Sequence, residues 1–131
     1  QAGIPFDDAL VVNGDYTTDK GELCARQLLS LQDRPTAIFA SNDQSAIGVL
    51  QAARALGLSI PADLSVVGFD NIPDAAYLNL TTVDQYIAEM GYQATKMLLR
   101  LINGETSDLQ MMKMETHLVV RNSCCSPTHS K

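Results

Sequence analysis

Short apolar runs alternate along the chain with segments in which apolar residues recur at helical spacing. The apolar runs, which predict strands, are residues 9–12, 36–40, 64–69 and 116–121. The amphipathic segments, which predict helices, are residues 20–31, 46–56 and 87–103. Because unbroken Val/Ile/Phe-rich runs suit strands buried on both faces of a parallel sheet, we predict an α/β fold, a parallel sheet with flanking helices.

Local signals set the ends of the first two helices. Thr17, Thr18 and Asp19 are alternative N-caps of the first helix, and Pro35 ends it because the residue before a proline avoids helical angles. Gly57 ends the second helix as a left-handed cap. The positions expected to face the sheet are Gly21, Cys24, Ala25, Leu28 and Leu31 in the first helix and Ala46, Val49, Leu50, Ala53 and Leu56 in the second.

The last helix, residues 87–103, has a broader apolar surface than the other two. Such a surface needs more than one neighbour, and large apolar patches seldom stay bare. We therefore expect its apolar side to be covered by another copy of the chain or left exposed. The polar segment after the final strand, residues 122–131, is expected to be loose.

Small polar residues directly follow two of the apolar runs. Asn42 and Asp43 come after the run 36–40, and Asp70 comes after the run 64–69. Open parallel sheets bind ligands in the crevice beyond the carboxyl ends of their strands, so we expect these side chains beside a small molecule. Each has a structural alternative, because Asn and Asp also cap helices and Asp70 can form an Asx-turn.

Composition and charge exclude several classes of protein. The 131 residues are enough for one globular domain, with 46% hydrophobic and 18% charged residues. A net charge of −6 argues against DNA binding by this stretch itself, because phosphate contacts need clustered Lys and Arg. No run is long enough to span a membrane, and residues 1–8 lack the features of an export signal. We expect a cytoplasmic protein without a membrane partner.

Candidate chemistry is sparse. The three cysteines include the adjacent pair Cys124 and Cys125, a poor geometry for a disulfide, so we expect free thiols. His117 and His129 have no partner at metal-ligand spacing. The sequence contains no Gly-x-Ser-x-Gly elbow, no Gly-x-Gly-x-x-Gly fingerprint and no phosphate loop. We therefore predict that the chain is not an enzyme and has no metal site and no cofactor.

Several longer blocks carry a family resemblance when they are taken together. They are Arg34-Pro-Thr-Ala-Ile-Phe-Ala-Ser-Asn-Asp-Gln-Ser-Ala-Ile-Gly48, Ile60-Pro-Ala-Asp-Leu-Ser-Val-Val-Gly-Phe-Asp-Asn71, Leu80-Thr-Thr-Val83, Glu89-Met-Gly91 and Leu118-Val-Val-Arg121. In this order and spacing the chain resembles the lactose-repressor/galactose-repressor family of bacterial transcription regulators. The resemblance covers roughly residues 3–123 and the C-terminal part of the family's effector-binding core.

The resemblance implies a periplasmic-binding-protein-like, Rossmann-like lobe that is incomplete in this chain. Residues 1–83 would belong to the C-terminal lobe, residues 84–115 to the N-terminal lobe, and residues 116–131 to the last crossover strand and tail. The ligand-binding residues that it implies are Asp70, Asn42, Tyr16, Gln85 and Asp43, with helix capping as the favoured role of Asp43. Tyr16, Asn42 and Asp70 should converge along one rim of the sheet.

The resemblance also implies a function and partners. The partners would be a small-molecule effector, a sugar or nucleoside-like compound, and a second copy of the chain in a homodimer. Operator DNA would be bound only through an N-terminal headpiece that this sequence does not contain. Asp84 and Tyr86 depart from the family pattern, which has a basic residue and a proline around Gln85. The alternative function is that of a periplasmic sugar-binding protein in a transport system.

Overall fold

The sheet has four strands, and the first three are parallel. The computed structural model describes residues 3, 5–105 and 111–127. The strands are β1 (Ala37–Phe39), β2 (Ser65–Phe69), β3 (Thr81–Asp84) and β4 (His117–Val119), in the spatial order β1-β2-β3-β4. β1 pairs with β2 and β2 with β3 in parallel, whereas β4 returns antiparallel to β3. The predicted α/β class is confirmed.

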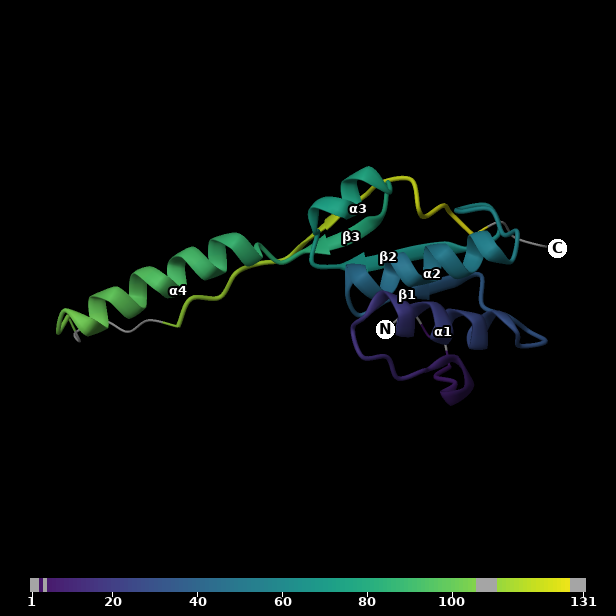
Figure 1. Cartoon of the computed structure of the whole chain (residues 1–131), viewed down its shortest axis with the longest axis horizontal. Coiled ribbons are helices and arrows are strands. Elements are labelled where there is room, and N and C mark those ends of the chain that lie inside the picture. The colour runs from purple at the N-terminus through teal and green to yellow at the C-terminus, as the bar shows by residue number, and fades with distance from the viewer. Residues whose placement is uncertain (1–2, 4, 106–110, 128–131) are drawn as a thin grey trace.

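In the described part of the chain, four α-helices connect or extend these strands (Figure 1). They are α1 (Thr18–Leu29), α2 (Asp43–Ala55), α3 (Pro73–Tyr77) and α4 (Ile87–Ile102). Thr17 is the N-cap of α1, one of the three predicted alternatives. The short helix α3 was not predicted; it begins with Pro73 at its first position, where proline has the right φ and lacks no needed N–H.

The hydrophobic core lies between one face of the sheet and the pair of helices α1 and α2. Ile38 and Val66 are partners in register and are both buried. On the other face Phe39 is 64% exposed. Burial therefore alternates along β1 and β2, and the expectation of burial on both faces is wrong for these two strands. A sheet that is covered on one side buries only every second side chain.

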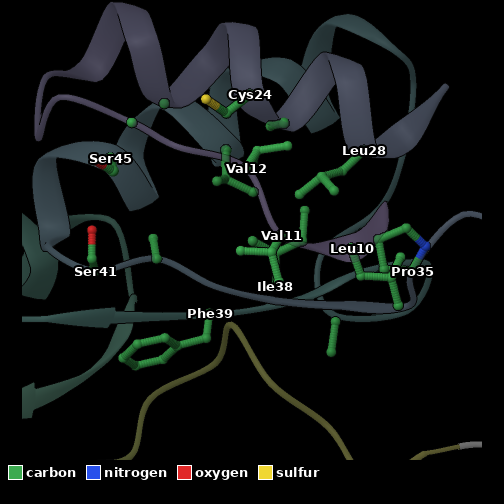
Figure 2. A pocket seen from close by; sticks show the side chains of 16 residues that line it. Leu10, Val11, Val12, Cys24, Leu28, Pro35, Ile38, Phe39, Ser41 and Ser45 are labelled. Atoms are coloured by element: carbon green, nitrogen blue, oxygen red, sulfur yellow. The ribbon is translucent and has the colours of Figure 1, made fainter. Parts of the chain in front are cut away.

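The predicted strand at residues 9–12 is wrong. Asp8–Leu10 form a short 3-10 helix, η1, which Asp7 caps, and Val11 continues in an extended conformation without a sheet partner. A cavity of about 380 Å³ lies between this segment and β1, with Leu10, Val11 and Val12 on one side and Ile38 on the other (Figure 2). No described residue pairs with the segment as a strand, so it does not extend the sheet beyond β1.

The C-terminal segment is fixed through Cys125, so the prediction of a loose tail is wrong for residues 122–125. The Ser123 carbonyl accepts from the Val66 amide at 2.8 Å, and its hydroxyl donates to the Val66 carbonyl at 2.6 Å. The Thr81 amide donates to the same hydroxyl at 2.7 Å. Ser123 thus bridges β2 and β3. The cysteines are free, as predicted; residues 128–131 lie outside the described part.

Helix α4 extends away from the sheet, to which it is joined by the segments leaving β3 and entering β4 (Figure 1). None of its residues is buried. Large apolar side chains are exposed along it, including Leu98 at 56% and Ile102 at 71%. In the single chain the apolar side of α4 is therefore exposed, and its coverage by a second copy stays a prediction.

Candidate functional site

The predicted site residues meet at the carboxyl-terminal edge of the parallel strands. Asn42 follows β1, Asp70 follows β2 and Gln85 follows β3. Because these strands are parallel, their carboxyl ends share one edge. The Asn42 amide donates to the Tyr16 carbonyl at 3.0 Å, which brings the loop before α1 to the same edge. Asn42 and Asp70 thus follow strands that end at one edge, with the Tyr16 backbone beside Asn42; the convergence of the three side chains on a ligand stays a prediction.

Asp70 and Gln85 form a side-chain pair across this edge. The Gln85 Nε2 atom donates to Asp70 Oδ1 at 2.6 Å, and the Asp70 amide donates to the Val83 carbonyl at 2.9 Å. Both side chains are half-buried. Within the described residues Asp70 Oδ2 has no donor, so it remains able to accept a hydrogen bond from a bound molecule. Asp70 has a φ of 114° and Asn71 one of 55°, a region that non-glycine residues seldom adopt.

Asn42 caps α2 and also holds the Tyr16 loop. Its Oδ1 accepts from the Ser45 amide at 2.9 Å while its Nδ2 donates to Tyr16. One N–H and one lone pair of the amide are left for another partner. Tyr16 itself has a φ of 68° and is exposed. Asn42 thus has a capping role beside any contact with a ligand.

Asp43 has a position that its sequence did not indicate. Capping was its favoured role, but Asn42 is the cap, and Asp43 is the first residue of α2 with its side chain fully buried. Its Oδ1 accepts from the Thr82 hydroxyl at 2.6 Å, and its Oδ2 accepts from the Ile72 amide at 2.9 Å. The carboxylate therefore links α2 to β3 and to the loop that follows Asp70.

A second set of polar residues supports the same loop, and the sequence did not single it out. The Arg121 guanidinium donates to Asn71 Oδ1 at 2.8 Å and to the Leu80 carbonyl at 2.7 Å. The Asn71 side-chain amide in turn donates through Nδ2 to Asp84 Oδ2 at 3.0 Å. The Tyr86 backbone N–H and this Asn71 amide hold the pKa of Asp84 below its usual range. The sequence signals were that Asn71 and Arg121 end two of the quoted blocks and that Asp84 departs from the family pattern.

An open hollow of about 490 Å³ lies where the chain crosses from β3 to α4. Its lining residues are Asp70, Asn71, Ile72, Pro73, Asp84, Tyr86, Ile87, Ala88 and Glu89. Carboxylates and amides beside apolar groups suit a ligand with several hydroxyls, because carboxylates accept hydrogen bonds and amides both donate and accept. The cavity beside β1 is mainly apolar and lies apart from these residues.

No group of three or more His, Cys, Asp or Glu side chains among the described residues is arranged to hold a metal ion. No helix in the described part of the chain is both long and apolar enough to cross a membrane.

A family model and sequence relatives both match nearly the whole chain. A family model described as a periplasmic binding protein-like domain matches residues 1–124. The HTH-type transcriptional repressor PurR of Photorhabdus laumondii is 38% identical over 125 residues, which are 94% of this chain and 37% of that protein. The chain thus spans well under half of the length of this relative.

Solved structures agree with the sequence relatives. The complex of the transcriptional regulator CelR with cellobiose aligns with a TM-score of 0.85 at 36% identity, covering 93% of this chain and 38% of that one. A LacI family transcriptional regulator from Lactobacillus casei with bound sucrose aligns with a TM-score of 0.72 at 32% identity, covering 82% of this chain and 41% of that one.

The relatives are transcriptional repressors and regulators, which are not enzymes, and they do not favour the transport-protein alternative. The matched region is the effector-binding core of such regulators. The chain belongs to the periplasmic binding protein-like family, as a part of the effector-binding core of a regulator of the lactose-repressor/galactose-repressor type.

Proposed function

We propose that this chain supplies one half of a saccharide-binding cleft in a cytoplasmic transcription regulator. The observation that carries the proposal is the Asp70–Gln85 pair at the sheet edge, with its 2.6 Å hydrogen bond and a second carboxylate oxygen to which no described residue donates. Two structural neighbours, at 36% and 32% identity, are complexes with cellobiose and sucrose. Sugar hydroxyls donate well to a carboxylate, so a saccharide is the favoured effector class over a nucleoside-like one.

Each site residue has a distinct role in this proposal. Asp70 accepts hydrogen bonds from sugar hydroxyls, and Gln85 orients it and lines the cleft. Tyr16 places its exposed ring against the apolar face of the sugar. Asn42 uses its remaining N–H toward the same molecule. Asp43 does not contact the effector, because its side chain is buried and both of its oxygens accept hydrogen bonds from the protein.

The mechanism follows from a cleft that needs two lobes. An effector that bridges the lobes favours the closed arrangement by its difference in affinity between the closed and open states. In a homodimer that difference is transmitted to DNA-binding headpieces outside this sequence. The exposed apolar side of α4 supports contact with further protein, since such patches mark interaction sites. Operator DNA is bound only through the headpieces.

The test is calorimetric titration of the full-length product of the gene that encodes this chain with cellobiose, sucrose and a panel of related saccharides. We expect one of them to bind, and Asp70→Asn to weaken that binding about tenfold or more, the effect of a charge-assisted hydrogen bond. Asp63→Asn is the matched control, because Asp63 caps the Ser59 amide away from the site. Unchanged affinity in the Asp70 variant contradicts the proposal, and so does micromolar binding by the 131 residues alone.

A further inference from the structure

We propose that Asp43 is a positioning residue for the effector site, which acts by holding the backbone of residues 70–72 so that the Asp70 carboxylate faces the cleft. The inference rests on the proposed function, because that proposal makes Asp70 a contact of the effector. The observation behind it is a fully buried carboxylate that is shared between α2, β3 and the loop after β2.

The fold makes specific room for this carboxylate. A Cβ atom on Gly68 of β2 would lie 2.2 Å from Asp43 Oδ1, so only glycine at that position leaves the oxygen its place. No described residue forms an ion pair with Asp43. The charge instead lies in the first turn of α2, where the helix dipole favours an anion. Burying a charge is costly unless it is hydrogen-bonded, and both oxygens of this carboxylate accept hydrogen bonds, one from the loop after β2 and one from β3.

The loop that Asp43 holds is strained. Asp70 and Asn71 have consecutive positive φ angles, 114° and 55°. Such conformations persist only when the surroundings over-determine them. Asp43 accepts a hydrogen bond directly from the Ile72 backbone N–H. The Thr82 hydroxyl that donates to Asp43 also accepts from the Asn71 backbone N–H at 3.4 Å. Asn71, the second of the two strained residues, and Ile72, which follows it, are thus fixed through one carboxylate.

The geometry requires an acceptor at both oxygens. The Ile72 N–H and the Thr82 O–H both point at Asp43. An asparagine would turn an N–H toward one of these donors. If the N–H faced Thr82, the Thr82 hydroxyl would have to accept a hydrogen bond from residue 43 instead of donating one. This change would weaken the bond that the same hydroxyl accepts from the Asn71 backbone N–H. An aspartate accepts from both partners at once.

The test uses ¹⁵N-labelled 131-residue chain and no effector, so its outcome is independent of whether a saccharide binds. In Asp43→Asn we expect hydrogen exchange of the Ile72 amide to accelerate roughly 10- to 100-fold, the loss of a charge-assisted bond. The Gln85 side-chain amide signals should move toward those of Gln51, an exposed residue in α2. The backbone amides of Ala52 and Ala53 in the core should keep their chemical shifts and exchange rates. In the control Asp63→Asn, the Ile72, Gln85, Ala52 and Ala53 signals should all stay unchanged.

A second pair of variants covers the case in which Asp43→Asn does not fold. Thr82→Val keeps the shape of the side chain but removes the hydroxyl, whereas Thr82→Ser retains it. We expect Thr82→Val to perturb the Ile72 and Gln85 signals and Thr82→Ser to restore them. A merely structural role would alter the core amides together with the loop. Unchanged Ile72 exchange and Gln85 shifts in a folded Asp43→Asn or Thr82→Val chain would overturn the inference.

Discussion

The contact between α1 and α2 leaves no room for one added methyl group at Gly48. A Cβ atom on Gly48 of α2 would lie 2.2 Å from the Thr18 carbonyl oxygen and 2.5 Å from the Glu22 amide nitrogen, both in the backbone of α1. A backbone cannot rotate out of the way as a side chain can. Gly48→Ala therefore requires α1 to retreat by about 1 Å, since favourable contacts between non-bonded atoms begin near 3.5 Å.

The expected loss of stability is the difference between two opposing effects. Overpacking costs roughly 1–3 kcal/mol, and a backbone obstacle belongs at the upper end of that range. Alanine is better than glycine in a helix interior by about 1 kcal/mol. We expect Gly48→Ala to lower the free energy of unfolding by about 2 kcal/mol, measured by urea denaturation followed by circular dichroism.

A matched control separates packing from propensity. Gly91 lies within α4, and a Cβ atom there would meet nothing within 4 Å. Gly91→Ala should therefore cost no stability and should raise the helix content slightly. A Gly48→Ala chain as stable as the original or more stable, with the same slope of unfolding against urea, would refute the close packing of α1 on α2.

Three further predictions concern other parts of the chain. Ser123→Ala should destabilise it by about 1–3 kcal/mol in the same urea assay, because a buried strand amide loses its acceptor, and a loss below half a kcal/mol would contradict the bridge. The pKa of the Asp84 carboxyl, followed by NMR, should lie below its ordinary value of 3.8. Because folding lowers this pKa, ionised Asp84 stabilises the fold above the unfolded pKa, and that stabilisation is lost as the pH falls through the folded pKa. Asp84→Asn should remove this part of the dependence of stability on acid pH. Replacing Leu98 and Ile102 with lysine should reduce concentration-dependent association in sedimentation velocity, whereas equal association would show that the apolar side of α4 is not responsible.

The elements that could be predicted are those whose signal is local. The N-cap Thr17 and the helical spacing of Ala25 and Leu28 describe α1 without reference to the rest of the chain. The run at residues 9–12 has equal local support, yet a strand exists only through its partner, and no described residue pairs with this segment. Ser123 likewise looks like part of a polar tail until β2 and β3 provide its partners.

The same distinction applies to the site. Asn42 and Asp70 could be placed at one edge because the ends of parallel strands meet there, and their chain positions alone give that result. The roles of Asp43 and Asn71 depend on contacts with β3 and Arg121, which are distant in the sequence. The two adjacent positive φ angles occur at Asp70 and Asn71, and because neither residue is a glycine the sequence does not indicate them.

The central claim is that Asp70 and Gln85 form the effector-contacting rim of this half-site. A crystal structure of the full-length protein bound to the saccharide that calorimetry identifies tests it most directly. We predict a sugar hydroxyl within about 3 Å of an Asp70 carboxylate oxygen, the usual length of an O–H···O hydrogen bond, with Gln85 still paired to the same carboxylate. A saccharide bound elsewhere, with Asp70 and Gln85 facing only water, would contradict the account.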